Sequence, residues 1–90
     1  MEHFKLFIEA LSKLLNKEFI LHWKEEPDFK WPIIKHITLE VHLLTSTGIS
    51  LVYSTEFKYN SSTTKKEKAQ KETAFIAMCD LLKKYGKEIQ

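Results

Sequence analysis

The sequence predicts an α+β domain in which two helices cover one face of a three-stranded antiparallel sheet, in the order α-β-β-β-α. Apolar residues recur at three- and four-residue steps near both ends of the chain, as in amphipathic helices. Between these segments apolar and polar residues alternate, as in strands that have one wet face. The length of 90 residues and the hydrophobic content of 43% fit a single domain over residues 1–90.

The first helix is expected from Glu2 to Asn16, where Asn16 and Lys17 can end it. Polar residues occupy its other side, among them Glu9, Ser12 and Lys13. Its expected buried stripe consists of Phe4, Phe7, Ile8, Leu11, Leu14 and Leu15.

A short first strand is expected from Glu18 to Lys24, because the run at residues 25–28 contains Pro27 and should break it. The following loop carries Phe29 and Trp31. These rings either fold back onto the core or form a contact surface, and we favour the core.

Two longer strands follow, from Lys35 to Leu44 and from Ile49 to Tyr59, joined by a hairpin loop at residues 45–48. On the earlier strand the apolar face is formed by Ile37, Leu39, Val41 and Leu43. On the later strand, uninterrupted alternation predicts an apolar face of Ile49, Leu51, Tyr53, Phe57 and Tyr59.

The last helix is expected to begin at Thr64, which forms a capping-box pattern with Glu67, and to stop at Gly86. We expect Cys79, the single cysteine, to be a packed helix thiol. The buried positions at helical spacing are Ala69, Thr73, Ala74, Ala77, Met78, Leu81 and Tyr85.

Four lysines crowd the start of this last helix: Lys65, Lys66, Lys68 and Lys71. The helix dipole opposes each cation there by roughly 0.3–1 kcal/mol, so the lysines do not serve stability. Lysines beside free helix amides can bind phosphate. The alternative, a solvated helix face, stays open from this stretch alone.

The charge distribution also points to this end of the chain. Residues 1–45 hold six lysines and seven acids (−1), and residues 46–90 hold eight lysines and five acids (+3), which together give the net charge of +2. Since the chain has no arginine, base recognition by bidentate forks is not expected, whereas point-charge contact with phosphate is.

Other function classes lack support in the sequence. Neither a membrane-spanning run nor an apolar signal segment is found, so a cytoplasmic location is expected. We expect no enzyme, because no nucleophile–base pair, phosphate loop or catalytic carboxylate pair is evident. No cofactor or metal site is expected either: His36 and His42 lie about 20 Å apart at strand spacing and cannot share an ion.

The element order and the lysine-rich helix start resemble the double-stranded-RNA-binding domain family. The family motif Ser-Lys-Lys-x-Ala-Lys-x-x-Ala-Ala-x-x-Ala-Leu, placed from Lys65, matches at Lys66, Ala69, Ala74 and Ala77. A weaker match, Lys35-x-Ile-x-Leu-Glu-Val41, resembles the second-strand pattern of the family. The histidine of the preceding loop and the glycines before the last helix are missing.

The resemblance implies largely sequence-independent binding of double-stranded or structured RNA through its sugar–phosphate backbone. Lys65, Lys66, Lys68 and Lys71 would follow phosphates across the major groove. One minor groove would meet Glu9 and Ser12, with Lys13 nearby, and the loop between the first two strands would meet the next. The alternative is a degenerate protein-interaction module, in which a protein partner or a second copy docks through the sheet or the Phe29/Trp31 loop.

Overall fold

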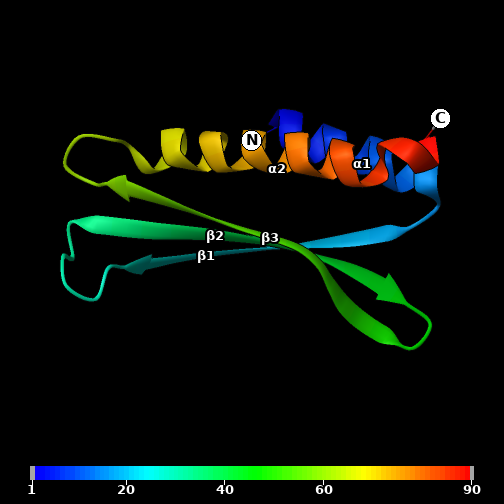
Figure 1. Ribbon diagram of the computed structural model, residues 1–90, viewed down its shortest axis with the longest axis horizontal. Helices are drawn as coiled ribbons and strands as arrows, with labels where there is room; N and C mark the ends of the chain where they lie inside the picture. Colours follow the sequence, from blue (N-terminus) through cyan, green and yellow to red (C-terminus); the bar gives the residue numbers. More distant parts are fainter. Residues whose placement is uncertain (1, 90) are drawn as a thin grey trace.

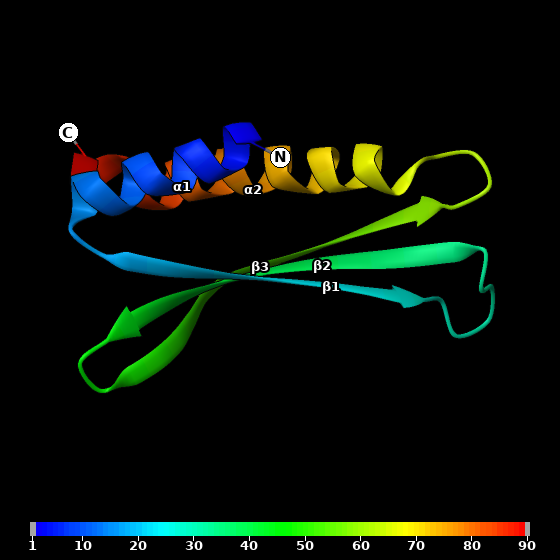
Figure 2. The same ribbon diagram turned by 180° about the vertical axis from the view of Figure 1, so that it is seen from behind.

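A computed structural model describes the backbone of residues 2–89 and the side chains of residues 2–88. Its elements are α1 (Glu2–Leu15), β1 (Glu18–Pro27), β2 (Ile34–Thr45), β3 (Gly48–Asn60) and α2 (Lys66–Ile89). The sheet has the order β1-β2-β3 with both neighbouring pairs antiparallel. Both helices lie on the same face of this sheet (Figures 1 and 2). The predicted architecture is therefore confirmed.

The core lies between the helix layer and the sheet. The aromatic ring of Phe4 meets Trp23 edge to face at 6.2 Å between centroids, which joins α1 to β1. Alanines on the buried face of α2 allow that helix to approach the strands closely. The buried residues of this cluster are Phe4, Ile8, Leu11, Leu39, Val41, Ala74, Ala77, Leu81 and Tyr85.

Two elements, β1 and α2, differ at their ends from the predicted positions. β1 continues to Pro27, which pairs with Lys35, because an edge strand tolerates a proline at its last position. α2 begins at Lys66, so Thr64 lies two residues before the helix and not at its N-cap, and the predicted capping box is wrong. Gly86 does not end α2, which runs on to residue 89. By contrast, Asn16 ends α1 with a left-handed φ of 53°.

A β-bulge changes which side chains of β3 face the core. The register between β2 and β3 shifts at Val41/His42, so that Val41 pairs with Tyr53 whereas His42 pairs with Leu51. The alternation of β3 is reversed beyond this point. Leu51 and Ile49 consequently lie on the outer face, 54% and 60% exposed, and not on the predicted apolar face.

Some apolar side chains predicted to be buried are exposed. Leu14 is 64% exposed, and Cys79 is an exposed thiol and not a packed one. Phe29 and Trp31 do not fold back onto the core, so the favoured interpretation of their loop is wrong. Within residues 2–89, no helix combines the length and the apolar character needed to cross a membrane.

Candidate nucleic-acid interface

The four lysines at the start of α2 are all exposed. Lys66 Nζ lies 3.7 Å from Glu25 Oε2 at the end of β1 and keeps 55% of its side chain exposed. Within the described chain, Lys65, Lys68 and Lys71 form no ion pair with any carboxylate. Three ammonium groups are thus available to an external anion, and the fourth is held by one solvent-accessible contact that contributes little.

The backbone beneath these lysines is fixed to the sheet. Ala69 is fully buried against Ile37 of β2 and Tyr59 of β3, in a small cluster separate from the main core. Burial, and then the charge of Glu25, raises the pKa of the Tyr59 hydroxyl. The buried Thr73 hydroxyl donates to the Ala69 carbonyl oxygen at 2.8 Å. Packing on the sheet thus holds the backbone of the first two turns of α2, while the side chains of Lys65, Lys68 and Lys71 extend from it without an ion pair in the described chain.

The loop between β1 and β2 is closed by its own hydrogen bonds. Asp28 Oδ2 accepts from the backbone amides of Lys30 and Trp31 at 3.0 and 3.1 Å. The Asp28 amide donates to the Ile34 carbonyl oxygen, and the Ile34 amide donates to that of Trp31, both at 2.8 Å. This arrangement turns three apolar side chains outward: Phe29 is 99%, Trp31 66% and Ile33 48% exposed.

Two contacts join this end of the sheet to α2 and to the segment that leads into it. The carbonyl oxygen of Ile33 accepts from the backbone amide of Ser61 at 2.9 Å and from its hydroxyl at 2.8 Å. The Glu25–Lys66 pair joins the end of β1 to the first turn of α2. Figures 1 and 2 show the β1–β2 loop and the start of α2 at the same end of the molecule. The lysine cluster and the exposed rings therefore share one end of the fold.

His36 on β2 supports the loop from the outer face of the sheet. Its Nε2 lies 2.7 Å from Asp28 Oδ1, and its Nδ1 lies 3.2 Å from Glu56 Oε1 on β3. Hydrogen bonding to Asp28, and then to Glu56, raises the pKa of His36. The hydrogen bond from His36, helped by the Trp31 and Lys30 amides, lowers the pKa of Asp28. His36 thus positions the loop.

This network predicts a measurable pH dependence. Because the pKa of His36 is raised, its contribution to stability is complete below the ordinary histidine pKa and is lost as pH rises through the raised value. The contribution of Asp28, whose pKa is lowered, is lost as pH falls through that lowered value. We expect Asp28→Asn, which keeps an oxygen for the turn but removes the charge, to lower the titration midpoint of the His36 ring measured by NMR.

The matched control for this titration is Glu40→Gln. Glu40 lies on the same face of β2 but contacts His42 at 3.3 Å and Lys24 at 3.4 Å, with no hydrogen bond to His36. The His36 midpoint should not move in this control. An Asp28→Asn protein with an unchanged His36 midpoint would show that Asp28 does not hold the ring in solution.

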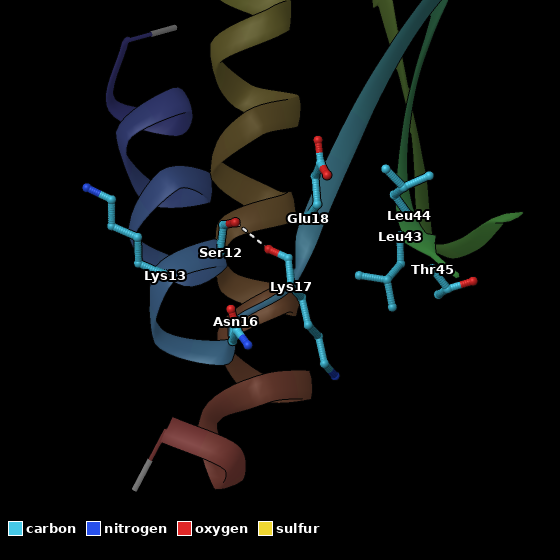
Figure 3. Close-up of a pocket in the computed structure, with 8 residues that line it drawn as sticks. All are labelled: Ser12, Lys13, Asn16, Lys17, Glu18, Leu43, Leu44 and Thr45. Atoms are coloured by element: carbon cyan, nitrogen blue, oxygen red, sulfur yellow. Dashed lines mark hydrogen bonds between the residues drawn. The ribbon is translucent and has the colours of Figure 1, made fainter. Parts of the chain in front are cut away.

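The predicted contact residues of α1 lie apart from the lysine cluster. Glu9, Ser12 and Lys13 line a shallow hollow of about 400 Å³ with the start of β1. Ser12 and Lys13 also border a larger hollow of about 690 Å³ that reaches Leu44 at the far end of β2, shown in Figure 3. The Ser12 hydroxyl donates to the Lys17 carbonyl oxygen, so its proton is used in closing the α1–β1 connection.

Lys71 lies beside the start of α1. It lines a hollow of about 230 Å³ with Phe75 of α2 and with His3 and Phe4 near the start of α1. The structure thus brings the four lysines together with the β1–β2 loop, whereas Glu9, Ser12 and Lys13 form a second group further along the helix layer. Among residues 2–89 no group of three His, Cys, Asp or Glu side chains could hold a metal ion.

Comparison of the chain with protein-family models, with curated protein sequences and with solved structures finds no match. The element order and the sheet topology are those that the resemblance to double-stranded-RNA-binding domains implies. Membership of that family remains a prediction.

The hydrogen bonds that close the β1–β2 loop were missed by sequence reasoning, although one signal for them was present. An aspartate followed by a short segment and a proline, as in residues 28–32, is typical of an Asx turn that rigidifies a loop. Such a turn predicts a loop with its own fixed shape, and rings on it need not reach the core. Nothing local indicated that His36 and Ser61 support the loop, because these contacts join segments far apart in the sequence.

Proposed function

We propose that this domain binds double-stranded RNA through the sugar–phosphate backbone, without recognising base sequence. The observation that carries the proposal is the set of three lysines, Lys65, Lys68 and Lys71, that crowd the positive end of α2 and form no intramolecular ion pair within the described residues. Phosphate groups would supply the missing negative charge, and the free amides at the helix start favour the same ligand.

The chemistry of the cluster favours backbone contact over base recognition. Lysine is a compact point charge, and the chain has no arginine to form a planar fork with guanine. Glu9 on α1 offers a carboxylate acceptor, which suits a ribose 2′-hydroxyl and repels phosphate. Together these groups fit a ligand that presents phosphates and 2′-hydroxyls in a regular array, which is A-form RNA.

Titration with nucleic acids of matched sequence tests the proposal. An RNA duplex of about 20 base pairs should bind more tightly than a DNA duplex of the same sequence or either RNA strand alone, because only the RNA duplex combines 2′-hydroxyls with A-form phosphate spacing. Fluorescence anisotropy at one fixed salt concentration gives the three affinities. Equal binding to the RNA and DNA duplexes would show that the cluster binds polyanions in general and does not distinguish RNA from DNA.

A second candidate function rests on the outer face of the sheet. Ile20, Leu44, Ile49 and Leu51 are between 36% and 60% exposed, and the strand register places them in two adjacent cross-strand rows. The patch borders the open edge of β3, and two such edges can pair about a two-fold axis. A second copy of the chain is thus the proposed occupant. Sedimentation of the free protein as a monomer at high concentration would exclude this candidate.

A further inference from the structure

The exposed rings of the β1–β2 loop are the strongest feature that backbone binding leaves without a role. Phe29, Trp31 and Ile33 project from a loop that is closed by Asp28, supported by His36 and attached to Ser61. Neighbouring large apolar side chains that are exposed to water typically mark a binding surface. Because the loop backbone is closed before binding, little backbone entropy is lost when the rings are covered.

We propose that Phe29 and Trp31 stack on unpaired bases, so that the preferred ligand is an RNA duplex interrupted by a bulge or an internal loop. This inference rests on the proposed function and specifies its substrate. The paired surface of A-form RNA offers phosphates and 2′-hydroxyls, to which an apolar ring adds little. Bases that have left the stack expose flat π-faces, on which aromatic side chains bind without regard to sequence.

The position and charge of the loop favour RNA over a lipid or protein partner. The exposed Lys30 lies between the two rings in the chain, and the Asp28 carboxylate is engaged by His36 and by the Lys30 and Trp31 amides. The hydrogen bonds from Ser61 to Ile33 fix the loop relative to the lysines that begin four residues later. A single strand whose phosphates lie on Lys65 and Lys68 could thus present its unpaired bases to the rings.

The test compares two RNAs that differ only in base pairing. One is a duplex of about 20 base pairs, and the other is the same duplex with a three-nucleotide bulge at its centre. We expect the bulged RNA to bind about tenfold more tightly, in line with the stacking of one or two bases. The double variant Phe29→Ala/Trp31→Ala should bind both RNAs equally, at the affinity that the wild-type protein shows for the paired duplex.

Two variants serve as controls for this comparison. Leu82→Ala removes a half-exposed apolar side chain near the C-terminal end of α2 and should keep the tenfold preference. Lys65→Ala/Lys68→Ala should weaken binding of both RNAs while keeping their ratio. Stacking also quenches indole emission, so the quench on adding bulged RNA should be present in the wild-type protein and lost in Trp31→Phe, which retains Trp23.

Four other outcomes would contradict stacking, and each would point to a different explanation. Equal, salt-sensitive binding of both RNAs by the wild-type protein would refute stacking and leave the proposed function intact, whereas binding of neither RNA would refute both. In a third outcome, the protein shows no preference between the two RNAs but sediments with phosphatidylserine vesicles, and the double variant does not. That result would assign the loop to a lipid surface. Self-association abolished by the same double variant would assign it to a second copy of the chain.

Discussion

Replacing Lys65, Lys68 and Lys71 together by alanine will weaken binding of duplex RNA roughly 10- to 100-fold at moderate salt, with no loss of thermal stability. The affinity falls because three charge-assisted contacts with phosphate are removed. The stability is unchanged or slightly higher, because each cation opposes the helix dipole and alanine has the higher helix propensity. Anisotropy titration and a thermal melt of the same preparation measure the two effects.

The matched control removes three lysines from the other end of α2. Lys83, Lys84 and Lys87 lie in the last turns, where the dipole favours cations, and Lys84 also donates to the Val52 carbonyl oxygen at 2.5 Å. Replacing these three by alanine lowers the net charge equally but should lower the melting temperature and leave most of the RNA affinity. Equal losses of affinity in both triple variants would mean that overall charge, and not the start of α2, governs binding.

Leu81→Ala will destabilise the domain by about 2–5 kcal/mol, whereas Leu82→Ala, one residue further along, will change stability by less than about 1 kcal/mol. Leu81 is fully buried between α2 and the sheet, and its loss leaves a cavity. The Leu82 side chain is 50% exposed and leaves none. Urea unfolding of both variants, followed by circular dichroism, gives the difference directly.

The size of this effect matters because the domain is small. A domain of this length has a total stability of the order of 5–15 kcal/mol, so the loss of Leu81 removes a large share of it. Equal destabilisation by Leu81→Ala and Leu82→Ala would contradict the packing of α2 described above.

The fold followed from periodic patterns because such patterns record which face of each element is buried. On α2, the stripe from Ala69 to Tyr85 is spaced at three and four residues, and six of its seven members are buried, with Met78 half-buried. On β2, the alternation of Ile37, Leu39 and Val41 with polar neighbours fixed the inner face. These assignments needed no knowledge of the partner strand.

The failures share a dependence on contacts that local patterns do not record. The bulge opposite Val41 is a property of strand pairing, so alternation alone placed Ile49 and Leu51 on the wrong face. Pro27 was expected to stop β1, but whether a proline is tolerated depends on the position of the strand in the sheet.

The candidate site was predicted only in part, for the same reason. The lysine positions follow from the sequence. Which of them is paired does not, because the contact of Lys66 with Glu25 depends on how α2 packs on the sheet, and the other three form no such pair in the described chain. The outward direction of Phe29 and Trp31 follows from the Asp28 turn together with the hydrogen bonds of Ser61 to Ile33, and the latter join segments far apart in the sequence and have no local signature.

The salt dependence of duplex RNA binding tests the central claim most directly, because each phosphate that a lysine neutralises releases a counterion and adds a fixed increment to the slope. Three lysines predict a slope of the logarithm of affinity against the logarithm of salt concentration of about −2 to −3, or about −4 if Lys66 leaves Glu25 for a phosphate. The Lys65/Lys68/Lys71 triple alanine variant should bring this slope to about −1 or closer to zero. A wild-type slope near zero, or an identical slope in the triple variant, would contradict the proposal that these lysines bind phosphate.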